Sequence, residues 1–371
     1  MKIAFLNKID VALFVSQTIL IVIGIITIFS TSYSSSGSDF VNFNKQAIFA
    51  IVGIVVFFVI SLVDYRAIKN YTGIIYVIAC IILILVAIMG KNIRGTAGWF
   101  DLGFVSLQPA EFVKIAMIII IAKYFTKIDI YINSFKKAIV SGIYVLIPVS
   151  LIMMQPDMGS ALIIIFIWIA MLILSGVNKK YILYITILAI VLSGIGWQYA
   201  LKDYQKSRIL SFFDSEYDPM GAGYNVRQSV IAIGSGNIWG KGLGHGSQSQ
   251  LNFLPEKHTD FIFAVIAEEM GFVGIILVIG LYGIIFYRLL RIAEEAEDNF
   301  GKYLVLGTSL LVFFHVVINI GMNMGIMPVT GIPLPLVSYG GSSLVSLMVM
   351  FGIVNSVYIK GRGYKFTKEE D

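Results

Sequence analysis

The chain of 371 residues has little of what soluble enzymes commonly use for chemistry or for covalent stability. It has one cysteine, Cys80, which lies in an apolar run, so no internal disulfide bond can form. The three histidines, His245, His258 and His315, form no HxxxH pair and have no cysteine cluster beside them, which argues against a built-in zinc site. Only 13% of the residues are charged, whereas 58% are hydrophobic. A soluble domain cannot bury so much apolar surface, so the composition predicts a polytopic membrane protein.

Apolar runs close to the length of a bilayer-spanning helix recur along the whole chain. They predict an all-α membrane protein with ten transmembrane helices, at residues 9–31, 45–63, 70–90, 108–125, 137–154, 158–175, 180–201, 259–288, 303–325 and 341–360. The first run ends in a serine-rich loop without a small-residue cleavage pattern, so we expect it to be a retained span and not a signal peptide.

The lysines and arginines are distributed unevenly between the predicted loops. If the N-terminus is inside, the short outer loops hold only Lys45, Lys91 and Arg94, and most of the other basic residues fall inside. This bias predicts that both termini are cytoplasmic and that a large outer loop, residues 202–258, joins spans seven and eight. The net charge of +5 is then mostly a signal of topology, and we expect no nucleic-acid partner.

A polar, glycine-rich loop runs directly into a long apolar helix between Gly244 and Gly271. Asp260 lies where that helix should start, which places a carboxylate near the boundary between water and lipid. An aspartate at this position also has a structural interpretation, because its carboxylate can cap free backbone N–H groups at a helix start.

Other polar groups interrupt the apolar segments. Glu111 and Lys114 are three residues apart and share one helix face, so they form either a structural ion pair or part of a cavity that they share with Asp260. Trp99 follows Arg94 in an outer loop, where a tryptophan is often only a membrane anchor. Asp157 lies in a Gln-Pro-Asp turn, where it could simply cap the next helix.

The outer segment 202–258 contains Arg208, Arg227 and Lys241 among glycines. Glycine-rich backbone with scattered cations suits a phosphate ligand, although no Walker or dinucleotide fingerprint is present. A second outer loop, residues 326–340, has three prolines within eight residues and is therefore stiff and irregular. Such backbone is tolerated at membrane depth where it lines a cavity or packs on protein. Asn319 and Asn323, one turn apart, add polarity to the preceding span.

Taken together, these blocks resemble the SEDS family of membrane proteins, in its RodA branch. The resemblance extends from the first span to Val357, and its long motifs are FDLGFVSLQPAEFVK, QPDMGSAL, DPMGAGYNVRQSVIAIGSG, GKGLGHGSQSQLNFLPEKHTDFIFAVIAEE and MPVTGIPLPLVSYGGSSL. It implies a peptidoglycan glycosyltransferase of the bacterial plasma membrane that polymerises lipid II on the outer face during cell elongation and shape maintenance. The implied partners are a class B penicillin-binding transpeptidase and the elongation machinery.

The same resemblance assigns roles to individual residues. The essential acid of the family falls on Asp260, the intramembrane acid–lysine pair on Glu111 and Lys114, and a functionally sensitive tryptophan on Trp99. Two positions depart from the family pattern: Gly98 stands where an arginine is common before that tryptophan, and QPSE has become QPAE. The first departure puts a phosphate role at that position in doubt, unless Arg94 substitutes.

In the predicted mechanism, Asp260 is the general base and a polyprenyl diphosphate is the leaving group. Arg94, Lys114, Arg208, Arg227 and Lys241 are the cations available to the diphosphate, and we favour Arg208 and Lys241. The other candidate substrate-binding residues are Gln228, Glu256, His258, Asp157 and Ser338. Mg²⁺ or Mn²⁺ could bridge the diphosphate and a carboxylate, but the sequence shows no ligand cage.

Two other functions fit a chain of this composition. A flippase for lipid-linked precursors would also have many spans, but it should show midplane acids in several helices or paired broken helices. We see no convincing internal repeat, and the unusual polar groups gather towards the outer face. A non-catalytic scaffold for a transpeptidase would not need Asp260, Glu111 or Lys114 for its role.

Overall fold

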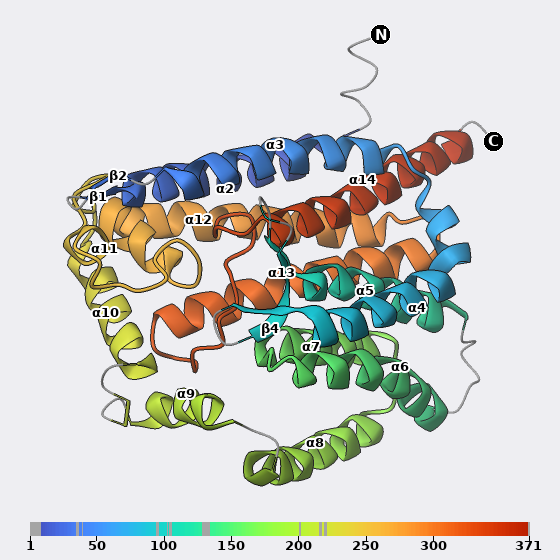
Figure 1. The fold of residues 1–371 in the computed structure, drawn as a ribbon. Coiled ribbons are helices and arrows are strands. Elements are labelled where there is room, and N and C mark those ends of the chain that lie inside the picture. The colour runs from blue at the N-terminus through green and yellow to red at the C-terminus, as the bar shows by residue number, and fades with distance from the viewer. Residues whose placement is uncertain are drawn as a thin grey trace.

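The computed structural model describes residues 9–34, 37, 38, 40–93, 96–101, 103, 106–127, 134–199, 202–214, 217, 218 and 221–369. Long helices dominate it and run side by side in one bundle (Figure 1). Each predicted span overlaps one of the helices α2 (Val11–Ser32), α3 (Val41–Ser61), α4 (Tyr65–Met89), α5 (Pro109–Lys127), α6 (Ser134–Met154), α7 (Met158–Leu174), α8 (Lys179–Tyr199), α12 (Ile262–Glu294), α13 (Asn299–Asn323) and α14 (Gly341–Glu369).

Seven helices within the described ranges are long and apolar enough to cross a membrane, namely α2, α3, α4, α6, α12, α13 and α14. The helix α7 is apolar but shorter, with 17 residues. The prediction of a helical, multi-span membrane protein is therefore confirmed, while the number of ten spans stays a prediction.

The segment 202–258, which the sequence predicts to lie outside, contains short helices, and two small sheets qualify the all-α prediction. Three short helices lie in the segment: α9 (Asp203–Phe213), α10 (Ala222–Ser235) and α11 (Ser247–Gln250). The strands β1 (Tyr33–Ser34) and β2 (Gly37–Ser38) form a hairpin, and β3 (Lys91–Ile93), β4 (Thr96–Asp101) and β5 (Ser106–Leu107) form an antiparallel sheet. These strands are too short to show a period-2 pattern, which is why the sequence did not reveal them.

The core of the bundle lies around α5 and the first turns of α12. From Ile262 to Glu269 every residue of α12 is at most 2% exposed, and α5 is buried from Ala110 through Glu111 and along most of its length. The helix α8 lies at the edge of the bundle and leads through α9 to α10 (Figure 1). The start of α2 and the end of α14 lie towards one end of the bundle, whereas β1, β2, α10 and α11 lie at the other end (Figure 1).

The helix α12 is interrupted at Gly271, where the backbone takes φ 66° and ψ −162°. A side chain there would collide with the backbone of Gly240, 2.3 Å away, so glycine is required both for the angle and for the close approach. The segment 236–250 satisfies the backbone groups that the break frees: Phe272 N donates to Asn237 O at 2.9 Å and Lys241 N donates to Glu268 O at 3.0 Å. These hydrogen bonds fix the buried first half of α12 against the segment 236–250.

Candidate active site

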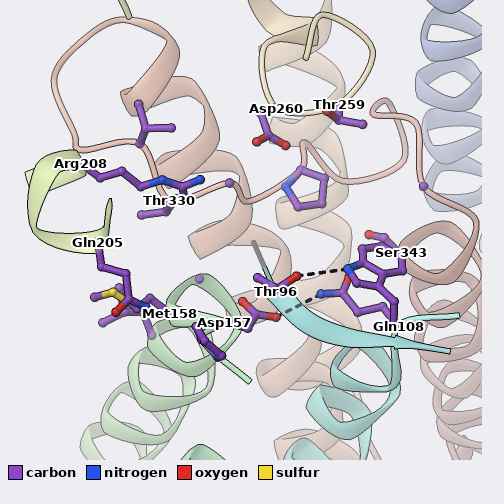
Figure 2. Close-up of a pocket in the computed structure, with 18 of the residues that line it drawn as sticks. Thr96, Gln108, Asp157, Met158, Gln205, Arg208, Thr259, Asp260, Thr330 and Ser343 are labelled. Carbon is purple, nitrogen blue, oxygen red and sulfur yellow. Dashed lines mark hydrogen bonds between the residues drawn. The ribbon is translucent and has the colours of Figure 1, made fainter. Parts of the chain in front are cut away.

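A cavity of about 210 Å³ opens among the loops at the end of the bundle that carries α9 (Figure 2). Its walls come from β4, the turn before α7, α9, the turn before α12 and the loop 328–343. Four of the residues predicted as site residues line it: Asp260, Arg208, Asp157 and Trp99. Segments that are far apart in the sequence thus bring together an acid, a cation and an aromatic ring.

Asp260 lies in the turn just before α12 and not at the capping position. The helix begins at Ile262, and its N-cap is Phe261, whose side chain is 1% exposed. The sequence placed Asp260 at the helix start, whereas the structure begins the helix two residues later. The backbone carbonyl of Asp260 accepts hydrogen bonds from Nδ2 of Asn319 and Nδ2 of Asn323, both at 2.9 Å.

The loop 326–340 is fastened to the same turn. Asn319 Nδ2 donates a second hydrogen bond, of 2.8 Å, to Ile332 O in this loop. The Ser338 hydroxyl donates to Thr259 O at 2.6 Å and accepts from Leu334 N at 2.8 Å. Ser338 is buried and does not line the cavity, so its predicted contact with substrate is replaced by a structural role.

Gly331 brings this loop between the two charged groups of the cavity. A methyl group added to Gly331 would lie 3.5 Å from Oδ2 of Asp260 and 3.6 Å from Nη1 of Arg208. The backbone there has φ 73°, in the left-handed region that favours glycine. The carboxylate and the guanidinium therefore face the same small volume without a side chain between them.

Arg208 reaches this position from α9, which is anchored by Tyr204. Tyr204 Oη donates to Pro156 O at 3.2 Å, and burial raises the pKa of the Tyr204 hydroxyl, so it stays protonated as a donor. The Arg208 guanidinium lies 5.9 Å from the centre of the Tyr204 ring, within range of a cation–π contact. Within the described ranges no carboxylate forms an ion pair with Arg208, which leaves its charge for a ligand.

The opposite wall of the cavity carries several polar side chains. Asp157 Oδ1 accepts from Ser160 N at 3.0 Å and so caps α7, as its structural interpretation predicted. Asp157 Oδ2 accepts from Gln108 Nε2 at 3.1 Å, and Trp99 Nε1 donates to Thr96 Oγ1 at 3.2 Å (Figure 2). Asp157 is therefore both a cap and a part of the cavity wall.

Glu111 and Lys114 do not line this cavity, which corrects the expectation that they share it with Asp260. Lys114 Nζ lies 2.8 Å from Glu111 Oε1 and 3.1 Å from His315 Nε2. All three side chains are at most 5% exposed. Helix packing encloses the pair between α5 and α13, so the structure corresponds to the alternative of a structural ion pair that connects two helices.

Lys241, the second cation that we favoured, is paired elsewhere. Its Nζ lies 2.9 Å from Glu268 Oε1, and this carboxylate also accepts from Gln248 N at 2.9 Å and Ser249 N at 3.1 Å. Lys241 does not line the cavity, so its expected role at the diphosphate is not supported. It neutralises a buried acid next to the break in α12.

Among the other predicted residues that the structure describes, none lines the cavity. Glu256 Oε2 accepts from Thr259 Oγ1 at 2.9 Å, and His258 Nδ1 lies 2.9 Å from Thr31 Oγ1, so both hold the turn that carries Asp260. Gln228 is half-buried on α10, where Arg227 is exposed. Arg94 lies outside the described residues.

Sequence reasoning missed several residues of the cavity, including Gln108, Tyr204 and Gly331. Gln108 is the first residue of the QPAE motif, in which the sequence analysis selected only Glu111 as a site residue. Nothing in the sequence marks Gly331 among the many glycines, because its value lies in its position between two other residues. Among the residues that the structure describes, no group of three or more His, Cys, Asp or Glu side chains could hold a metal ion.

Comparison with known proteins identifies the family of the chain. The model of the cell cycle protein family FtsW/RodA/SpoVE matches residues 11–362. Peptidoglycan glycosyltransferase MrdB of Escherichia coli is 40% identical over 326 residues, which cover 88% of each chain. Peptidoglycan glycosyltransferase RodA of Treponema pallidum is 32% identical over 431 aligned positions, which cover 96% of this chain and 99% of the relative.

Two solved structures share the fold. A chain from a peptidoglycan synthase complex, studied for its coordination of polymerization and crosslinking, superposes with a TM-score of 0.81 at 28% identity and covers 95% of this chain and 98% of its own. The rod shape determining protein RodA of Thermus thermophilus gives a TM-score of 0.70 at 26% identity, with 94% and 96% covered. With nearly its whole length matched, the chain belongs to the FtsW/RodA/SpoVE family of membrane proteins.

Proposed function

We propose that this chain is a peptidoglycan glycosyltransferase that polymerises lipid II on the outer face of the bacterial plasma membrane during cell elongation. The names of its relatives in Escherichia coli and Treponema pallidum support this activity. The single observation that carries the chemistry is the placement of Asp260 and Arg208 on either side of Gly331 in one cavity. An acid that can take a proton and a cation that can stabilise a leaving diphosphate are the two groups that this reaction needs.

The proposed topology has ten spans, with both termini cytoplasmic and the segment 202–258 outside. The uneven distribution of lysine and arginine supports it. The placement of the start of α2 and the end of α14 towards one end of the bundle is consistent with it (Figure 1). In this orientation the cavity, β4 and α9 all belong to the outer end, where lipid-linked sugars would reach them.

In the proposed reaction, the Asp260 carboxylate accepts the proton of the GlcNAc 4-hydroxyl as that oxygen attacks MurNAc C1 of a second lipid-linked disaccharide. The bond from C1 to the diphosphate oxygen breaks, and the electron pair leaves with the diphosphate. The donor linkage is α and the product linkage is β, so one inverting displacement suffices. Arg208 stabilises the negative charge that grows on the leaving group. A divalent cation such as Mg²⁺ or Mn²⁺ would add charge at the same place, but no step depends on it.

The side chains of the opposite wall suit a sugar substrate. Asp157, Gln108 and Thr96 offer acceptors and donors for sugar hydroxyls, and Trp99 adds an aromatic surface. A small number of polar groups on an otherwise apolar wall is typical of small-molecule sites. We therefore assign this wall to the sugars and the side that carries Arg208 to the diphosphate.

The proposed partners are lipid II, a class B penicillin-binding transpeptidase and the elongation machinery. The similarity to a chain of a peptidoglycan synthase complex supports an association with a crosslinking enzyme. Polymerase and crosslinking enzyme would then act on the same glycan strand as it forms.

The test is polymerisation of lipid II by the purified full-length chain, with and without its cognate transpeptidase. We expect glycan polymer on a gel from wild-type protein and none from the Asp260→Asn variant. Transport of a fluorescent lipid-linked precursor across liposomes without polymer would instead identify a flippase. Normal cell shape with Asp260→Asn in place of the wild-type chain would identify a scaffold.

A further inference from the structure

A second cavity, of about 230 Å³, lies directly beside the first. The two cavities share Arg208, Pro328 and Val329 as lining residues, so Arg208 stands at their boundary. The second cavity continues away from Asp260, which does not line it, between α9, α10 and the end of α13. A ligand that extends past Arg208 would thus leave the first cavity, with its polar side chains, and enter the second cavity.

The side chains that line the second cavity are mostly apolar. Its walls include Phe212 of α9, Val226 and Val230 of α10, and Met324 and Met327 after α13. Besides Arg208, the only lining residue with a polar side chain is Ser211. Its hydroxyl donates to Ser207 O at 2.6 Å within α9, so it makes its hydrogen bond inside its own helix.

The surface next to this cavity is apolar as well. Phe213 is 80% exposed and Ile326 is 61% exposed. Large apolar side chains with this exposure are unfavourable in water but suited to contact with lipid hydrocarbon. An isoprenoid chain that left the cavity on this side would therefore meet further apolar side chains.

We infer that the second cavity binds the first isoprene units of the donor lipid, with Arg208 at its diphosphate. This inference rests on the proposed function and names the subsite for one of its two substrates. The donor has three parts in sequence: the sugar carbon that reacts, the diphosphate and the polyprenyl chain. The structure offers Asp260, Arg208 and the apolar cavity in the same order.

The order of the groups assigns the cavity to the donor and not to the acceptor. In the acceptor the reacting hydroxyl belongs to the outer sugar and is separated from the diphosphate by the whole disaccharide. Only in the donor does the diphosphate bond directly to the carbon that is attacked near Asp260. The carboxylate and the guanidinium flank one small volume beside Gly331, which suits a group in which reacting carbon and phosphate are neighbours.

The test compares two substitutions at adjacent positions of α10. Val230 lines the second cavity, whereas Ile231 lines neither cavity, and both are 45% exposed. Val230→Trp places a ring in the cavity, and Ile231→Trp adds the same ring elsewhere on the helix. The probe is a radiolabelled long-chain polyprenyl diphosphate without sugar, bound to the purified full-length chain in phosphatidylglycerol nanodiscs.

We expect Val230→Trp to weaken binding of this probe by at least about tenfold, because the indole ring fills space in which the isoprene units would be buried. Ile231→Trp should change it by less than about twofold, since surface substitutions away from a site have small effects. Arg208→Gln should weaken the binding of the polyprenyl diphosphate but not the binding of the corresponding polyprenol. Equal binding by the two tryptophan variants would overturn the inference, and so would equal competition by polyprenol, which would indicate a generic lipid-tail groove.

A second pair of variants covers the case in which Val230→Trp does not fold. Val230→Cys and Ile231→Cys are smaller changes, and a thiol-reactive polyprenyl diphosphate should label the first at least about tenfold faster. Equal labelling would overturn the inference. Neither assay requires turnover, so the proposed subsite and the proposed glycosyltransferase function can fail separately. If the chain forms polymer but the variants at positions 230 and 231 bind and react with the probe equally, the subsite proposal fails and the proposed function stands. If only the Val230 variants differ in binding or labelling and the chain forms no polymer, the proposed function fails and the subsite stands.

Discussion

Asp260 and Arg208 face one another across Gly331, whose missing side chain leaves their charged ends at the same small volume. A methyl group there would lie 3.5 Å from the Asp260 carboxylate and 3.6 Å from the Arg208 guanidinium. The three residues come from the turn before α12, from α9 and from the loop after α13, so only the folded chain brings them together. The first predictions concern this relationship.

Replacing Asp260 by asparagine keeps the shape of the side chain but removes the base. We expect polymerisation of lipid II to fall by about 10²- to 10⁴-fold, the usual contribution of general acid–base catalysis. Thermal stability of the purified protein should stay close to that of wild type. The matched control is Asp203→Asn, an exposed acid in the first turn of α9 that does not line the cavity. If both variants polymerise lipid II at the wild-type rate, the assignment of Asp260 is wrong.

Gly331→Ala should reduce turnover far more than it reduces stability. The left-handed backbone at φ 73° costs an alanine roughly 1–2 kcal/mol, and the added methyl also occupies the space between the charged groups. Gly176→Ala is the control, because Gly176 has φ 76° but its methyl would meet no atom within 4 Å. Both variants should lose similar stability in a thermal assay, and only Gly331→Ala should lose polymerase activity. Equal activities would show that the volume beside Gly331 is not used.

Asn319→Leu should lower turnover more than Asn323→Leu does. Both asparagines are fully buried and donate to the carbonyl of Asp260, but only Asn319 also donates to Ile332 in the loop that carries Gly331. Each leucine leaves a buried carbonyl short of a donor, at a cost of about 1–3 kcal/mol. Initial rates measured well below the unfolding temperature separate the two effects. A greater rate loss in Asn323→Leu would contradict this order.

Lys114→Met should destabilise the protein by about 3–5 kcal/mol, because it leaves Glu111 buried without its ion-pair partner. The double variant Glu111→Leu/Lys114→Met should recover most of this loss, although His315 still lacks its contact with Lys114. Because the pair does not line the cavity, activity should return together with stability. Recovered stability with no activity would restore the hypothesis that the pair binds substrate.

Arg208→Met and Lys241→Met should affect different properties. Arg208 lines the cavity, so its loss should raise KM for lipid II or lower kcat at nearly unchanged stability. Lys241 neutralises Glu268, which is fully buried, so its loss should mainly destabilise the fold. Thermal unfolding and steady-state polymerisation of the two variants distinguish the roles. The opposite pattern would return Lys241 to the site as a diphosphate contact.

Much of the fold follows from the sequence because membrane insertion imposes simple rules. Long apolar runs had to become helices, and the described residues contain a helix at each predicted span. One boundary differs by two residues, since α12 begins at Ile262 and not at Asp260. The small sheets were not predicted, because strands of two to six residues carry no readable period.

The sequence by itself determined a membrane protein with many helical spans, and it predicted as site residues Asp260, Arg208, Asp157 and Trp99, which line one cavity. It could not decide which cations were free, because pairing depends on distance and burial: Lys114 lies against Glu111 and His315, and Lys241 lies against Glu268. Only the tertiary structure placed Gly331 between the acid and Arg208, and an apolar cavity on the far side of that cation. The physical reason is that charge and hydrophobicity are properties of single residues, whereas a site is a set of distances that packing alone fixes.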